Sequence, residues 1–172
     1  YDLLREEFIG IHCTSLHGDN WTAVAKSGFK VVWSPLSNLI LYNRTADIAD
    51  ALKKGVPIQH IALAPDWAPS GNPNQLFEAK TANEYNIRRL NGLLTPKNIF
   101  SMLTEHPALM TGYDDVLGSL AKGRRADITV IKIKDSDPYK SFLLAGIEDI
   151  NLVLIDGQPL YGSLSDFGKF DK

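Results

Sequence analysis

The sequence contains a single cysteine, Cys13, among 172 residues. One cysteine excludes an internal disulfide framework and a metal site built from several thiolates. We expect Cys13, which lies beside a predicted strand, to behave as a small buried apolar side chain. The candidates for the function of this chain are therefore other residue types.

The sequence also lacks a large excess of one charge and long apolar runs. The formal net charge is -2 at pH 7, so the composition favours neither a nucleic-acid partner nor a membrane surface. No apolar stretch approaches the roughly 20 residues that cross a bilayer, and no signal peptide is visible. We expect a globular protein with a cytoplasmic location. Because the chain begins without a methionine, we also expect it to be a piece of a longer protein.

The first third of the chain alternates between strand-like and helix-like segments. This order, with short connections, predicts a parallel sheet with right-handed crossovers. The carboxyl ends of parallel strands share one edge of a sheet, so we expect His12, residues 34–38 and Asp66 to lie together at that edge. The predicted strands cover residues 8–13, 29–33 and 58–64, and the predicted helices cover residues 19–27 and 45–54.

The pattern changes in the second half of the chain. Asp156-Gly157 is a favoured two-residue hairpin turn between two apolar runs. We place a domain boundary near residue 115, with an α/β domain over residues 1–115 and a small β domain over residues 116–172. Other expectations are helices over residues 75–90 and from Thr95 toward His106, strands over residues 118–120, 126–131, 151–155 and 158–161, and a loose tail over residues 163–172.

Three parallel strands make a poor core by themselves, whereas a closed (β/α)₈ barrel needs eight. The sheet is therefore either small and open, or part of a larger sheet whose remaining strands belong to a longer protein.

Asp66 is the strongest candidate for chemistry. The structural alternative is a turn residue or a helix N-cap. A carboxylate at the end of a strand, at the same edge of the sheet as His12, could form part of a metal site or of an acid/base pair. Zinc takes three or four ligands, and a lone histidine is more often structural. Spacing alone therefore leaves the functional and structural interpretations even.

The remaining polar candidates are weaker. Residues 34–38 form either an ordinary turn or the rim of a substrate pocket. We expect His17 to be exposed, His60 to be packed within a strand, and His106 to be a cap or surface residue. The sequence has no glycine-rich phosphate loop, no serine nucleophile elbow and no Cys/His dyad.

Three stretches together resemble the carboxyl-terminal half of the amidohydrolase superfamily, in its branch of cytosine deaminases, guanine deaminases and chlorohydrolases. They are GIHCTSLHGDNWTAVAKSGFKVVWSPLSNLIL, GVPIQHIALAPDWAPSGNPNQLFEAKTA and LTPKNIFSMLTEHPALMTGYDDVLGSLAKGRRADITVI. The first is similar to the sixth and seventh barrel strands, the second to the eighth strand with its metal-binding aspartate, and the third to the closing helices. The resemblance covers the chain up to about Gly162.

The resemblance implies the last three β/α units of a TIM-type (β/α)₈ barrel, followed by strands of a small β-sandwich. It also implies a divalent metal, zinc first and iron second, whose water hydrolyses a C–N or related bond of a small molecule. Asp66 would bind the metal and take the proton from the water. His12 would hold or polarise that water, or bind a second metal. Substrate binding would fall to Ser37, Asn38, Trp67 and His17.

The sequence departs from the family pattern in several places. Nothing matches the histidine pair of the family's first strand or the histidine of its fifth strand. Trp33 stands where many relatives have histidine, and Ala64-Pro65 replaces the usual small residue and threonine or serine. We therefore expect this chain alone to bind metal weakly and to have no turnover.

The expected partners are a small-molecule substrate and a second copy of the chain, because exposed parallel edges invite pairing. Neither a nucleic acid nor a membrane is expected. Two alternatives remain: a non-catalytic α/β binding module, in which Asp66 and His12 only cap and pack, and a catalytically dead amidohydrolase relative.

Overall fold

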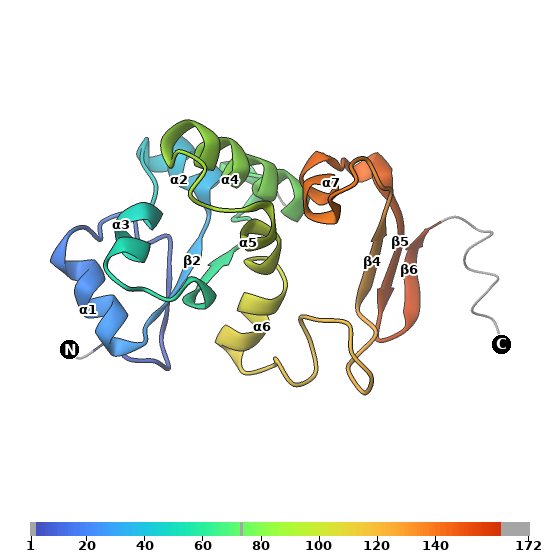
Figure 1. The fold of residues 1–172 in the computed structure, drawn as a ribbon, viewed down its shortest axis with the longest axis horizontal. Coiled ribbons are helices and arrows are strands. Elements are labelled where there is room, and N and C mark those ends of the chain that lie inside the picture. The colour runs from blue at the N-terminus through green and yellow to red at the C-terminus, as the bar shows by residue number, and fades with distance from the viewer. Residues whose placement is uncertain (1–2, 73, 163–172) are drawn as a thin grey trace.

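The structure is a computed structural model that describes residues 3–72 and 74–162. It holds two three-stranded sheets, and helices α4 to α6 lie between them (Figure 1). The predicted loose tail lies outside the described residues. None of the helices in the described ranges has the length and apolar character of a membrane span. The helices are α1 (Asp19–Ser27), α2 (Pro35–Tyr42), α3 (Ile48–Lys53), α4 (Gln75–Arg89), α5 (Pro96–Ser101), α6 (Glu105–Thr111) and α7 (Pro138–Leu144).

The first sheet is parallel, as predicted, in the order β1 (Ile9–Ile11), β2 (Lys30–Trp33) and β3 (Ile61–Leu63). The register pairs Val32 with Ala62, and Gly10 with Val31. Because all three strands run the same way, their carboxyl ends meet at one edge. The described residues form an open sheet and no closed barrel.

The outer edge of β3 is covered by the corner between α5 and α6. The Leu63 N–H donates to the Met102 carbonyl at 2.7 Å, and His106 Nδ1 lies 3.0 Å from the Ile61 carbonyl. A carbonyl only accepts, so Nδ1 carries the proton. The prediction of His106 as a cap or surface residue is wrong, because the side chain is 6% exposed and satisfies a strand edge.

Several element boundaries differ from the prediction, and the helix expected from Thr95 toward His106 is two helices, α5 and α6. Residues 34–38, expected as a turn, open helix α2, because Pro35 occupies its first position with a preset φ. The helix expected from residue 45 begins at Ile48, where Asp47 caps it by accepting the Asp50 N–H. The third strand is shorter than predicted because residues Ile58–His60 form a 3₁₀ turn, η1. His60 therefore precedes the strand.

The second sheet is antiparallel, in the order β4 (Ile128–Ile131), β5 (Ile150–Ile155) and β6 (Gln158–Gly162). The predicted hairpin is confirmed, and both turn residues have positive φ, 51° at Asp156 and 78° at Gly157. The predicted strand over residues 118–120 is wrong. There the Leu117 carbonyl accepts the Arg124 guanidinium at 2.8 Å, and Gly118 has a φ of 85°, which turns the chain.

The core joins the parallel sheet to its covering helices. Helix α7, which the sequence analysis did not predict, closes the core against α4 and α5 (Figure 1). Its Phe142 lies edge-on to Phe100 with ring centroids 5.2 Å apart. The largest fully buried apolar side chains are Trp21, Trp33, Ile48, Ile61, Ile99 and Met102.

Asn86 ties the end of α4 to the loop that follows it. Its carboxamide donates to the Leu94 carbonyl and accepts the Leu94 N–H, both at 2.8 Å, and the side chain is 2% exposed. Replacing Asn86 with alanine leaves two buried backbone groups unpaired. We expect the free energy of unfolding, measured by urea denaturation, to fall by about 1–3 kcal/mol.

Glu84→Ala on the same helix is the matched control. The exposed Glu84–Arg88 ion pair, at 2.9 Å, should contribute less than about 1 kcal/mol. Equal losses in the two variants would show that the Asn86 contacts contribute nothing special.

Candidate functional site at the carboxyl ends of the parallel strands

Asp66 follows β3 and collects hydrogen-bond donors from three neighbours. Its Oδ1 accepts the Trp67 N–H at 2.7 Å. Its Oδ2 accepts the Ser37 hydroxyl at 2.5 Å and, more weakly, the Ser70 hydroxyl at 3.5 Å. Ser37 comes from the first turn of α2, so two strand ends meet at one carboxylate.

These contacts lower the pKa of the Asp66 carboxyl. The largest cause is the Ser37 hydroxyl, followed by the Trp67 N–H, and partial burial opposes them. Hydrogen bonds to the ionised form favour that form. The carboxylate therefore stays charged at neutral pH, which suits a group that holds a cation.

His12 reaches this carboxylate through an unusual backbone turn. The Cys13 N–H donates to the Ile11 carbonyl at 2.8 Å, and His12, between them, has a φ of 68°. Cys13 follows with a φ of 52°. Two successive positive-φ residues other than glycine are uncommon, and such backbone clusters at functional sites. The turn places His12 Nε2 3.6 Å from Asp66 Oδ2.

The donor types of this pair fit a metal. Imidazole nitrogen and carboxylate oxygen are both ordinary zinc ligands. The distance of 3.6 Å between His12 Nε2 and Asp66 Oδ2 is longer than a hydrogen bond. The two atoms are therefore close but do not bond to each other directly. Within residues 3–72 and 74–162, no cluster of three or more histidine, cysteine or acidic side chains could hold a metal ion. His12 and Asp66 could therefore contribute to a metal centre but not complete one.

Two aromatic residues neighbour the pair, Trp67 in the sequence and Tyr42 in space. Trp67, directly after Asp66, is 71% exposed. Tyr42, at the end of α2, lies edge-on to His12 with ring centroids 6.2 Å apart. Flat apolar faces beside a charged group suit a ligand that carries an aromatic ring. Tyr42 could not be identified from the sequence, because its spacing from His12 gives no local signal.

The two other predicted site residues, Asn38 and His17, make hydrogen bonds to residues other than Asp66. Asn38 is buried, and its amide donates to the Thr45 hydroxyl at 3.0 Å. His17 is exposed in the loop before α1, where its backbone N–H donates to Asn20 Oδ1 at 3.2 Å. Substrate binding by Asn38 and His17 stays a prediction.

Ser70 and Glu78 also belong to this neighbourhood and were missed. Ser70 lies four residues after Asp66, in a Pro-Ser-Gly turn whose composition indicates only a turn. Glu78 lies on α4, in a segment with several charged residues, where nothing in the sequence marks one carboxylate as buried.

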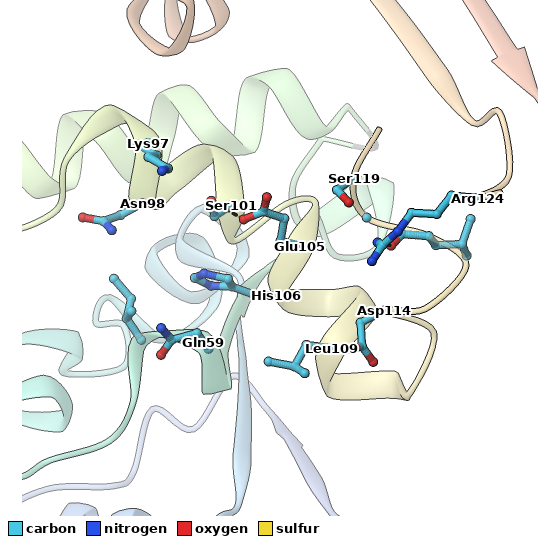
Figure 2. Close-up of a pocket in the computed structure, with 13 residues that line it drawn as sticks. Gln59, Lys97, Asn98, Ser101, Glu105, His106, Leu109, Asp114, Ser119 and Arg124 are labelled. Carbon is cyan, nitrogen blue, oxygen red and sulfur yellow. Dashed lines mark hydrogen bonds between the residues drawn. The ribbon is translucent and has the colours of Figure 1, made fainter. Parts of the chain in front are cut away.

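A cavity of about 570 Å³ lies elsewhere, at the amino end of β3 (Figure 2). Gln59, Glu105 and His106 line it, and the Ser101 hydroxyl donates to Glu105 at 3.2 Å. None of His12, Ser37, Asp66 and Trp67 lines this cavity. The cluster around Asp66 lies at the opposite end of the strand and is separate from this cavity.

The sequence model of the Amidohydrolase family matches residues 1–160. A 5-methylthioadenosine/S-adenosylhomocysteine deaminase from Syntrophus aciditrophicus is 28% identical over 166 residues, which are 91% of this chain and 37% of that protein. A 5'-deoxyadenosine deaminase from Methanosarcina mazei is 26% identical over 164 residues, 90% of this chain and 37% of that protein. The chain thus spans little more than a third of the length of these relatives.

Solved structures share the fold of the chain. An adenosine deaminase from Xanthomonas campestris with bound zinc superposes with a TM-score of 0.82 at 20% identity, covering 98% of this chain and 42% of that one. Guanine deaminase from E. coli gives a TM-score of 0.76 at 22% identity, covering 95% and 41%.

Proposed function

Because this chain belongs to the amidohydrolase family, we propose that it is the carboxyl-terminal part of a metal-dependent deaminase that acts on a purine-type ring. The observation that carries the proposal is the meeting of His12 and Asp66 at the ends of two parallel strands, 3.6 Å apart. The relatives named as adenosine-type deaminases support the substrate class, as do the ring faces of Trp67 and Tyr42.

The proposed reaction replaces an amino group by oxygen: a C–O bond forms from water, a C–N bond breaks, and ammonia leaves. A divalent ion such as zinc supplies a site of this kind with a water that loses its proton near neutral pH. Asp66 would be one ligand of that ion and would take the proton from the water. His12 Nε2 would orient the water by a hydrogen bond. Ser37 holds the Asp66 carboxylate in place, and Trp67 stacks on the ring of the substrate.

The wider architecture is part of this proposal. The sheet β1-β2-β3 corresponds to the last three strands of a (β/α)₈ barrel over residues 1–115, and β4 to β6 belong to a small β-sandwich over residues 116–172. The other metal ligands then come from a longer protein, since His12 and Asp66 alone fall short of the three or four ligands of a zinc site.

The test uses the product of the complete coding sequence that contains this chain. We expect about one zinc or iron per chain by plasma mass spectrometry, lost or strongly reduced in Asp66→Ala. The same protein should release ammonia from 5'-deoxyadenosine or S-adenosylhomocysteine. A metal-free protein that is indifferent to Asp66→Ala and releases no ammonia would overturn the proposal in favour of a non-catalytic binding module.

A further inference from the structure

Glu78 is a buried carboxyl group that makes a hydrogen bond to the helix that carries Ser37. It lies on α4 and is 1% exposed. Its Oε1 accepts the Leu36 N–H at 3.0 Å, across 42 residues of sequence. Burying a carboxyl group costs free energy unless the group is hydrogen-bonded. The burial of Glu78 therefore needs an explanation beyond packing.

The partner of Glu78 is the amino end of α2. Pro35 begins this helix and has no N–H, so the Leu36 N–H is the first donor that lacks a partner inside the helix. Ser34 stands at the N-cap but makes no capping hydrogen bond through its side chain within the described part of the chain. Glu78 therefore does from α4 what an N-cap side chain does locally, and a carboxylate there also suits the helix dipole.

The residue after Leu36 is Ser37, which donates to Asp66 at 2.5 Å. A direct series of contacts thus runs from Glu78 to the Leu36 backbone, to the Ser37 hydroxyl and to the Asp66 carboxylate. If the first turn of α2 shifts or frays, the Ser37 hydroxyl is the first group of the site to move.

We propose that Glu78 is a positioning residue, which fixes the first turn of α2 so that Ser37 keeps its hydroxyl aimed at Asp66. The inference rests on the proposed function for its catalytic meaning, since only there does the Asp66 carboxylate need a fixed orientation. The contact itself is independent of any metal or substrate.

The test uses the product of the complete coding sequence that contains this chain and has two readouts. Hydrogen exchange followed by mass spectrometry measures the protection of the peptide that contains the first turn of α2, and ammonia release gives kcat/KM. Glu78→Leu removes the acceptor of the Leu36 N–H but keeps an apolar side chain of similar size, so hydrogen exchange in this peptide should become faster. Glu78→Gln keeps an oxygen for the Leu36 N–H and should leave the exchange slow.

Ser37→Ala sets the scale for the rate, because it removes the hydroxyl that donates to Asp66. Glu78→Leu should lower kcat/KM by a comparable factor, and Glu78→Gln should retain most of the activity. In the Ser37→Ala background, Glu78→Leu should cause no further loss. Glu78→Met replaces Glu78→Leu if the latter does not fold.

Unchanged hydrogen exchange in the first turn of α2 of folded Glu78→Leu overturns the inference, as does a loss of kcat/KM that persists in the Ser37→Ala background. Failure of the proposed function gives a different result. In that case the complete protein releases no ammonia, while hydrogen exchange in the first turn of α2 still depends on Glu78.

Discussion

Replacing Trp33 with alanine is expected to lower the free energy of unfolding by about 3–5 kcal/mol. Trp33 lies on the central strand β2 and is 0% exposed. Its ring lies edge-on to Tyr85 with centroids 6.0 Å apart, and its indole N–H donates to the Thr45 hydroxyl at 2.6 Å. The expected loss is a large share of the roughly 5–15 kcal/mol that stabilises an ordinary domain.

Urea denaturation followed by far-ultraviolet circular dichroism measures this loss. Trp67→Ala is the matched control, because it removes the same side chain from an exposed position and should change stability by less than about 0.5 kcal/mol. Trp33→Phe should fall between the two, since it keeps most of the ring but leaves Thr45 without its indole partner. Similar midpoints for the two alanine variants would show that the core does not depend on Trp33.

The parallel sheet and its functional edge were predictable because both follow from local patterns and topology. Gly28 ends α1 with a φ of 73°, a left-handed conformation that favours glycine. The end of this helix could therefore be predicted from the sequence. Three apolar runs separated by such helices leave few arrangements besides a parallel sheet. The placement of His12, Ser37 and Asp66 at one edge of the sheet then follows from strand direction.

The contacts that refine the site could not be predicted in the same way. Glu78 and Leu36 are 42 residues apart, and His106 and Ile61 are 45 apart. Such pairs depend on how helices pack and leave no periodic trace in the sequence. The backbone turn at His12 was equally hidden, because histidine carries no signal for positive φ comparable to that of glycine.

Ambiguous turn chemistry explains the other differences. The Ser34-Pro35 pair opens a turn and a helix equally well, so the sequence predicts a turn over residues 34–38, where α2 begins. The sequence predicts a strand over residues 118–120, whereas a side-chain hydrogen bond from Arg124 to the Leu117 carbonyl holds this segment as a loop. The Asp156-Gly157 pair is not ambiguous in this way, because it favours a two-residue hairpin turn. Both residues have the positive φ that such a turn requires.

Asp66→Asn in the complete protein is expected to lower kcat/KM for ammonia release by about 10²–10⁴-fold, the range for loss of a positioned proton-transfer group. Asparagine keeps the size of the side chain, and its carbonyl oxygen can still accept from Ser37 or the Trp67 N–H. The substitution removes the negative charge that faces His12 Nε2 at 3.6 Å. The loss should therefore come from chemistry and not from unfolding, which circular dichroism checks.

Ser70→Ala is the control for this experiment, because Ser70 contacts the same carboxylate oxygen only at 3.5 Å and should change the rate far less. Metal analysis of Asp66→Asn then separates the two roles assigned to Asp66. A variant that keeps its metal but loses kcat identifies Asp66 as the group that moves the proton. A variant that loses both identifies it first as a ligand. Activity close to that of the unaltered protein would place the reacting centre away from β3, and the meeting of His12 and Asp66 would then be a structural contact at a strand end.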